Sequence, residues 1–585
     1  MATTYNMPEA ETGQCEARAP AVLAGLILLG GFLTIVVSLY MVVVSYSSLP
    51  YYDQWAEVTY AANGGNLFSP AWLWERWLEH RHVIPKLFFG ADLYWFQCRQ
   101  IFLLASIFVI QLLHLAVLSW GMWSLGRWRG PLWLTGTGLA AFCLFYPSQW
   151  ENFIWGFQVC FVLAHLLASL SFVALLLYSR QFQQHSENSS SPRFLVISLL
   201  AALAATYSLA SGNLLWPILI AAAVYLRLRY TATISIVGAG IVSTGLYFYH
   251  YVRPGHHPRP IFSNLRAPLR MVSFLAEYLF GTWTHHGIYV AACIVIGELA
   301  IAVVLVFLAR AYFRRLGLLG IQLLLTMVFC AATAMITAAG RSSLGAVLAR
   351  VSRYQTVVLL FWCCAGLLLL GFSFFARVRV RHSFVAAQLM LLVVLAAGFT
   401  RIEAPIAQAR RHGFMLDTAA ASLLTGVYDQ PQLEWVYPIL DELGRDVSYL
   451  QVHQLSIFSG PVQSWFGKRL EYVFPEVSFS DCNGAVETVV SVDTLGARGI
   501  RLSGWAWDTK RRAPPSAVVV TLNGVIRGYG SVGQRHASPG GVQPKIADGY
   551  MGFVAYAPAA PRGSLVTIYA VLKGARPTAC FIAAK

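Results

Sequence analysis

The chain has 585 residues, of which 57% are hydrophobic and 12% are charged, and its net charge is +16. This excess of apolar side chains excludes an ordinary soluble protein and indicates a membrane protein that crosses the bilayer several times. The positive charge does not indicate nucleic-acid binding, because the basic residues stand at the ends of apolar segments and not in Lys/Arg-rich runs. We therefore expect membrane lipids as partners and no nucleic acid.

The first apolar segment begins after a short polar tail, residues 1–20. The run 21–46 is too long for the core of a cleaved signal peptide, so it predicts a retained transmembrane helix. At about 20 apolar residues per crossing, the sequence predicts a mainly helical transmembrane domain over 21–400 with about eleven spans. They lie near 21–46, 101–125, 131–147, 157–178, 195–210, 214–226, 231–250, 287–309, 317–339, 354–376 and 384–400.

Arginines follow alternate spans and predict the orientation. They are Arg127, Arg129, Arg180, Arg193, Arg227, Arg229, Arg310, Arg314, Arg315, Arg377, Arg379 and Arg381. Because Lys and Arg are concentrated in cytoplasmic loops, these loops and the N-terminus are assigned to the cytoplasm. The loop that contains Asp53, loops 147–157, 250–286 and 340–353, and all residues after 400 are then extracytoplasmic.

The apolar density falls after residue 400. Residues 401–474 carry Leu and Tyr at roughly helical spacing and predict an amphipathic helical segment. Residues 475–585 contain short β-branched runs between Gly, Pro and Asn-Gly turns, such as Asn523-Gly524, which predicts a small all-β domain of sandwich type. Cys482 and Cys580 stand near its two ends and suggest a disulfide, and hence an oxidising compartment.

The first outer loop carries the first candidate residues. Asp53 follows the first span and precedes Gln54 and Trp55. A carboxylate at this point is either a cap or surface charge, or a general base that removes a proton from an acceptor hydroxyl during sugar transfer. Gln54 and Trp55 favour the second interpretation, because both side chains are suited to contact a sugar.

Further along the same loop, Glu79-His80-Arg81-His82 and Lys86 combine charged and aromatic groups. One interpretation is an amphipathic interfacial helix whose cations reach lipid head groups. The other is a substrate site in which the planar guanidinium of Arg81 binds phosphate. The two histidines, two residues apart, are weak evidence for a metal.

Two more outer loops repeat this combination. Residues 146–158 place Glu151 among Trp and Gln side chains, which fits either an interface turn or a sugar-lining segment. In the loop 340–354, a salt bridge would explain the presence of one arginine. Three arginines so close together are better explained by a bound anion, such as a lipid-linked phosphate. The candidates from this loop are Arg341, Arg350, Arg353 and Tyr354.

No nucleotide-binding motif and no paired acidic motif for a sugar-nucleotide metal occurs in the sequence. The histidines of the loop 250–286 lack metal-ligand spacing. We therefore expect no required cofactor, find no support for a divalent metal, and expect a sugar donor that is carried by the membrane.

In layout, residues 20–400 resemble the GT-C superfamily of integral membrane glycosyltransferases. The resemblance rests on Tyr52-Asp53-Gln54-Trp55, Glu79-His80-Arg81, the break at Gly212–Pro217, and Arg341 with Ser352-Arg353-Tyr354. It implies a polyprenyl-phosphate-linked donor and an essential acidic residue in the first extracytoplasmic loop, the position of Asp53. The paired acidic motif of the metal-dependent oligosaccharyltransferase branch is missing. The C-terminal domain, with Gly504-Trp505-Ala506-Trp507-Asp508, resembles β-sandwich modules of bacterial surface-polysaccharide enzymes, as a scaffold or as a carbohydrate-binding module.

The resulting hypothesis is a glycosyltransferase of the bacterial inner membrane that transfers a sugar, with inversion, to an extracytoplasmic glycan, lipid or protein. Asp53 is the expected base. The expected donor-phosphate ligands are Arg81, Arg341, Arg350 and Arg353, and the expected substrate contacts are Gln54, Trp55, Glu79, His80, Lys86, Glu151 and Tyr354. One alternative is a transporter or flippase of lipid-linked saccharides, against which stands the lack of an internal repeat. Another is a surface-assembly protein whose β-domain is the active part.

Overall fold

The computed structural model describes most of the chain. The described residues are 9–184, 192–252, 266–280, 306, 309–310, 316–375, 380–494, 497–536, 549–561, 563–574 and 578–584. The chain forms two compact units whose segments alternate along the sequence. Unit 1 comprises Met1–Tyr40, Leu73–Lys86 and Ala105–Ile406, and unit 2 comprises Met41–Trp72, Leu87–Leu104 and Ala407–Lys585.

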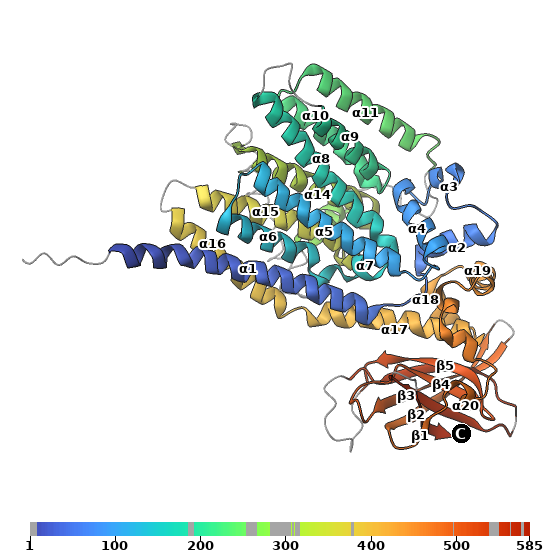
Figure 1. The fold of residues 1–585 in the computed structure, drawn as a ribbon. Coiled ribbons are helices and arrows are strands. Elements are labelled where there is room, and N and C mark those ends of the chain that lie inside the picture. The colour runs from blue at the N-terminus through green and yellow to red at the C-terminus, as the bar shows by residue number, and fades with distance from the viewer. Residues whose placement is uncertain are drawn as a thin grey trace, which may run out of the picture. The chain divides into compact units, whose positions relative to one another are not determined.

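The described part of the chain is mostly helical (Figure 1). In chain order its α-helices are α1 (Glu9–Ser45), α2 (Trp55–Ala62), α3 (Pro70–Trp74), α4 (Val83–Trp95), α5 (Ile101–Ser124), α6 (Gly130–Phe145), α7 (Trp150–Ile154), α8 (Val159–Gln184), α9 (Arg193–Thr206), α10 (Leu215–Tyr225), α11 (Tyr230–Phe248), α12 (Arg266–Phe280), α14 (Leu318–Arg341), α15 (Gln355–Phe375), α16 (Val380–Phe399), α17 (Glu403–Thr425), α18 (Gln430–Val436), α19 (Leu440–Val452) and α20 (Leu470–Val473).

Among the described residues, seven helical stretches are long and apolar enough to cross a membrane, which indicates a multi-pass membrane protein. They are Ala19–Ser45, Ile101–Ser124, Gly156–Phe182, Tyr230–Phe248, Leu318–Leu344, Ser352–Phe374 and His382–Thr425. The count of about eleven is not reached, partly because the predicted spans 195–210 and 214–226 become α9 and α10, with 14 and 11 residues. Both are shorter than the roughly 20 residues of a straight crossing. The predicted span 287–309 falls almost wholly outside the described residues.

Unit 1 is a helical bundle. α8 packs against α9 and α14, and α15 packs against α14 and α6, so helices far apart in sequence lie side by side (Figure 1). A second contact surface is formed by α10 and α11, with Trp216 and Ile236 in its core. Pro217 lies in the first turn of α10, where its missing N–H removes no helix hydrogen bond. The predicted break at Gly212 is a 3-10 turn, Ala210–Leu214, between α9 and α10.

The C-terminal part of unit 2 is all-β, as predicted. Its strands are β1 (Val477–Ser478), β2 (Cys482–Thr494), β3 (Ala497–Asp508), β4 (Ala517–Leu522), β5 (Val525–Gln534), β6 (Gly552–Pro558), β7 (Val566–Leu572) and β8 (Thr578–Ala584). They form one sheet in the order β1-β8-β7-β4-β5-β6-β3-β2, in which only the β1–β8 pair is parallel. β4 is buried along nearly its whole length, as expected for an Ala-Val-Val-Val run in the middle of a sheet.

The sheet is curled, and this corrects the expectation of two separate sheets. Cys482 of β2 and Cys580 of β8 are joined by a disulfide, with 6.1 Å between their Cα atoms. β2 is one edge of the ladder and β8 lies beside the other edge, so the two ends of a single sheet must approach each other. The predicted turn at Asn523 and Gly524 joins β4 to β5, and both residues have positive φ, at 52° and 78°, as a two-residue hairpin turn requires.

Candidate functional site

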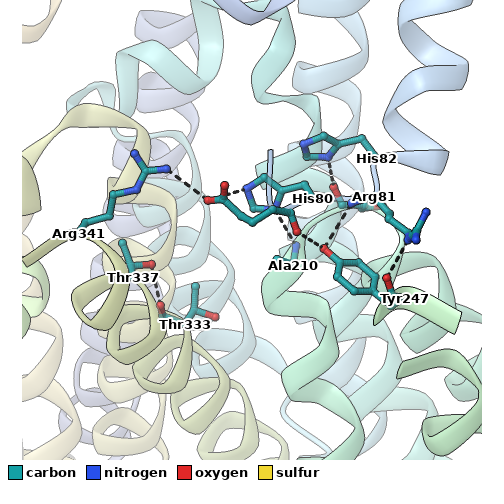
Figure 2. A network of polar contacts seen from close by, with 10 residues as sticks. His80, Arg81, His82, Ala210, Tyr247, Thr333, Thr337 and Arg341 are labelled. Carbon is teal, nitrogen blue, oxygen red and sulfur yellow. Dashed lines mark hydrogen bonds and ion pairs between the residues drawn. The ribbon is translucent and has the colours of Figure 1, made fainter. Parts of the chain in front are cut away.

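A polar network in unit 1 brings three of the predicted residues together (Figure 2). The carboxylate Oε1 of Glu79 lies 3.3 Å from a terminal guanidinium nitrogen of Arg341 and 3.5 Å from Nε2 of His80. Arg341 ends α14, whereas Glu79 and His80 belong to the segment between α3 and α4. The ion pair therefore joins two residues that lie 262 positions apart in sequence.

The protonation of His80 is set by the backbone. The N–H of Ala210 donates to Nδ1 of His80 over 3.2 Å, so Nδ1 carries no proton. The neutral ring must then hold its proton on Nε2, the nitrogen that faces Glu79. His80 is thus positioned as a hydrogen-bond donor to the Glu79 carboxylate, in the role of a supporting residue.

His82 is buried close to His80, with 4.9 Å between the ring centroids. Its Nδ1–H donates to the carbonyl oxygen of Ser208 over 2.7 Å. Burial, together with the neighbouring His80, keeps the pKa of His82 well below its usual range. His82 is therefore neutral at physiological pH and supplies no positive charge to a phosphate.

Arg81 and Lys86 were both predicted to contact the donor or substrate. Their side chains donate hydrogen bonds to main-chain carbonyl oxygens. Only 4% of Arg81 and 3% of Lys86 is exposed. The guanidinium of Arg81 donates to three carbonyl oxygens at 2.6–2.8 Å, those of Trp74, Tyr247 and Tyr249. The Nζ of Lys86 donates to the carbonyl oxygen of Glu75 over 2.8 Å. Both cations hold the loop in place, because their hydrogen bonds tie it to the end of α11 and to its own main chain.

Arg341, at the end of α14, and Arg350 and Arg353, which follow it, each contact a carboxylate. The pairs are Arg341 with Glu79, Arg350 with Glu277 of α12, and Arg353 with Glu151. Salt bridges thus account for all three arginines, although the sequence alone favoured an anionic ligand for a group of three. The arginine side chains are still 30–33% exposed. Because a guanidinium has five N–H donors, the single carboxylate contact of Arg341 leaves donors available to a further anionic ligand.

Glu151 organises this segment. Its Oε2 accepts the backbone N–H of Arg353 over 2.9 Å, and its own N–H donates to Oγ of Ser352 over 2.9 Å. Glu151 therefore caps the 3-10 turn Ser352–Tyr354 and positions the guanidinium of Arg353. Tyr354 is buried and stacks on Tyr278, with 5.0 Å between ring centroids. Glu151 and Tyr354, both predicted to contact the substrate, thus have structural roles in this segment.

Asp53 lies in unit 2, in a 3-10 turn that follows α1 (Tyr52–Gln54). Tyr52 has φ of 51°, an uncommon backbone conformation for a bulky residue, which is held only where the surroundings enforce it. Gln54 is buried, donates to the side chain of Gln100 and accepts the N–H of Tyr51. Asp53 itself is half-buried. The turn thus fixes a carboxylate at a partly exposed position, while Gln54 belongs to the scaffold.

Trp55 is fully buried, so it has no face for a sugar, contrary to its predicted role. It lies beside Tyr437, with 5.9 Å between the ring centroids. One turn further along α2, the hydroxyl of Thr59 donates to Asp446 of α19, whose pKa is raised by burial. Within unit 2, the residues that follow α17 therefore pack against the first loop and support it.

Sequence reasoning missed two residues of these networks. The hydroxyl of Tyr247 donates to the carbonyl oxygen of Glu79 over 2.9 Å and accepts the N–H of Arg81 over 3.3 Å. Glu277 is the partner of Arg350. Tyr247 lies near the end of an apolar span like many other tyrosines, and Glu277 stands in the loop 250–286, where histidines are more prominent. Neither position carries a local signal that would have identified it.

No cluster of potential metal ligands occurs among the described residues. Of the loop 250–286, residues 253–265 and 281–286 lie outside the described part. Comparisons of the chain with models of protein families, with curated proteins and with solved structures find no match. Fold and site together define a multi-pass helical membrane protein with a C-terminal β-domain, and its function has to be argued from the residues alone.

Proposed function

We propose that the chain is a GT-C-type glycosyltransferase of the bacterial inner membrane. It takes a sugar from a polyprenyl-phosphate donor and transfers it to an extracytoplasmic glycan, lipid or protein. The observation that carries the proposal is the setting of Asp53, a half-buried carboxylate on an enforced turn in the first loop after α1. A fixed and partly desolvated carboxylate fits a general base better than a surface charge does.

The reaction is a single displacement. The acceptor oxygen attacks the anomeric carbon of the sugar, its proton passes to Asp53, and the bond between the anomeric carbon and the phosphate oxygen breaks with inversion. The leaving phosphate takes the electron pair and needs positive charge near it. We assign this charge to Arg341, with Arg350 and Arg353 as further candidates, because these guanidinium groups are oriented by carboxylates and remain partly exposed.

The proposal also includes an orientation, with the N-terminus in the cytoplasm and Asp53 and the β-domain outside it. Two observations support it. Arginine-rich loops follow alternate apolar segments. The disulfide between Cys482 and Cys580 favours an oxidising compartment for the β-domain.

The test uses purified protein in lipid vesicles that contain polyprenyl-phosphate sugars. The measured quantity is released polyprenyl phosphate. Asp53→Asn should lower release by about a hundredfold or more, the usual contribution of a general base. Glu75→Gln is the matched control, since Glu75 is an exposed carboxylate of the same outer loop, and it should leave release unchanged.

Two outcomes would contradict the proposal. One is an Asp53→Asn variant that transfers sugar as fast as the wild type. The other is a wild-type protein that moves the intact donor across the bilayer without releasing polyprenyl phosphate, which would identify a flippase.

A further inference from the structure

Unit 2 contains a cavity of about 660 Å³ between α17 and strands β3, β5 and β6. Its size lies within the range of small-molecule sites, about 300–1,000 Å³. Three arginines and three aromatic residues are among the residues that line it: Arg411, Arg501, Arg535, Phe414, Tyr550 and Tyr556. None of the described residues that line it is acidic.

The charge of the cavity is not neutralised at its wall. Arg411 and Arg535 are exposed, and neither forms an ion pair with any residue that the structure describes. Arg501 is different, because its guanidinium donates to Oδ2 of Asp429 over 2.8 Å. Burial opposes the charge of Arg501, but the hydrogen bond and the charge of Asp429 raise its pKa. Three cations therefore line the cavity. The carboxylate of Asp429, which pairs with one of them, is buried and does not line it.

The wall is also held in place. Oδ2 of Asp429 accepts the hydroxyl of Tyr556 over 2.7 Å in addition to Arg501, so both side chains are oriented by one buried group. The guanidinium of Arg410 lies 4.6 Å from the ring centroid of Tyr550. Gly533 has φ of 151°, and a Cβ there would lie 3.3 Å from the ring of Phe414. Glycine thus allows α17 to pack closely on β5. Such preorganisation reduces the entropy that a ligand loses on binding.

The chemistry of the wall selects among ligands. A lipid chain or an apolar peptide would leave the guanidinium groups of Arg411 and Arg535 and the amide of Gln534 without partners. A small inorganic anion would not fill the volume. A planar guanidinium matches a carboxylate with two parallel hydrogen bonds, and a tyrosine ring presents an apolar face with a polar edge. These features fit a ring-shaped, polyhydroxylated anion.

We infer that this cavity binds an anionic saccharide, a short glycan whose sugars carry carboxylates. The arginines bind the carboxylates, the partly exposed ring of Tyr550 contacts a sugar ring, and Ser503, Gln432 and Gln534 bind hydroxyls. The inference goes beyond the proposed transfer reaction, because binding here requires neither Asp53 nor a lipid-linked donor. The tryptophans of the β-domain take no part, since Trp505 and Trp507 are buried around Met551.

The test is isothermal titration calorimetry, in which trigalacturonate is titrated into the full-length protein in lipid nanodiscs. Maltotriose, a neutral trisaccharide, and inorganic phosphate are the comparison probes. We expect trigalacturonate to bind and the two comparison probes to bind at least tenfold more weakly. Arg411→Gln and Arg535→Gln should each weaken trigalacturonate binding about tenfold, the effect of losing one charge-assisted hydrogen bond. Higher salt should weaken it as well.

Arg527→Gln is the matched control, because Arg527 is an exposed arginine of β5 that does not line the cavity. It removes the same charge from the same domain and should leave binding unchanged. Tyr550→Leu removes an aromatic face without a change of charge, and it should weaken binding while leaving the salt dependence as it is.

The inference is overturned if trigalacturonate does not bind, if maltotriose binds equally well, or if phosphate binds as tightly as the saccharide. It also fails if Arg527→Gln weakens binding as much as the cavity variants do. The Asp53→Asn protein should bind trigalacturonate like the wild type. Failure of transfer and failure of binding are therefore measured separately.

Discussion

Replacing Arg81 with methionine tests whether this cation holds the loop or binds a phosphate. The side chain is 4% exposed and donates to three carbonyl oxygens at 2.6–2.8 Å. A hydrogen bond to a charged group contributes roughly 1.5–3 kcal/mol, so three bonds at the lower value amount to roughly 4–5 kcal/mol. Arg81→Lys keeps the charge, but its single nitrogen cannot span the three acceptors. If two bonds are lost, it should cost about 3 kcal/mol.

Arg341→Met is the comparison variant. Arg341 has one carboxylate contact at 3.3 Å and is 33% exposed, and such a pair contributes less than about 1 kcal/mol. The assay is the rate at which monodisperse protein is lost in detergent at a fixed elevated temperature, since large membrane proteins unfold irreversibly. Arg81→Met should be lost much faster than the wild type, and Arg341→Met at nearly the wild-type rate. An Arg81→Met protein as long-lived as the wild type but inactive in transfer would refute the structural role and restore Arg81 as a substrate ligand.

Three further predictions concern unit 2. Burial raises the pKa of Asp92 to about 7, so between about pH 4 and about pH 7 the folded protein binds this proton more tightly than the unfolded chain. Wild-type stability should fall as pH rises through this window relative to Asp92→Asn, and parallel pH profiles would contradict the assignment. The disulfide of the β-domain links residues 98 positions apart and should contribute about 4–5 kcal/mol. Reduced protein should then be digested at lower temperature than oxidised protein, and identical digestion would argue against this. A Cβ on Gly413 would lie 2.3 Å from the carbonyl oxygen of Ser45, whereas one on Gly444 meets nothing within 4 Å. Gly413→Ala should cost roughly 1–3 kcal/mol or more in thermal-shift measurements, and equal effects at the two glycines would show that the close approach is not enforced.

Local properties of the chain were predictable from the sequence, because they depend on residues near one another. Apolar runs gave the long helices, and the Asn523-Gly524 pair identified a hairpin turn that the structure contains. Where the apolar run is short, length could not decide between a crossing and a shorter helix, as α9 and α10 show. The curl of the β-sheet depends on pairing between distant strands, which no local pattern reports.

Roles that depend on partners could not be predicted. Arg81 and Arg341 look alike as arginines of predicted outer loops, but one contacts three carbonyl oxygens and the other a carboxylate 262 positions away. Trp55 was a candidate sugar contact by residue type, yet it is buried. Residue type indicates what a side chain can do, whereas burial and the identity of its neighbours decide what it does.

The alternation of the two units along the chain has a consequence for dividing the protein. Unit 2 draws on Met41–Trp72, Leu87–Leu104 and Ala407–Lys585. The N–H of Ser456, for example, donates to the carbonyl oxygen of Gln97 over 2.7 Å. A fragment that ends at residue 400 would therefore keep Asp53 but lose the helices that support its turn. The halves 1–400 and 401–585 should be inactive alone and regain activity only when produced together, and a foreign β-domain could replace the native one only if it left residues 407–460 intact.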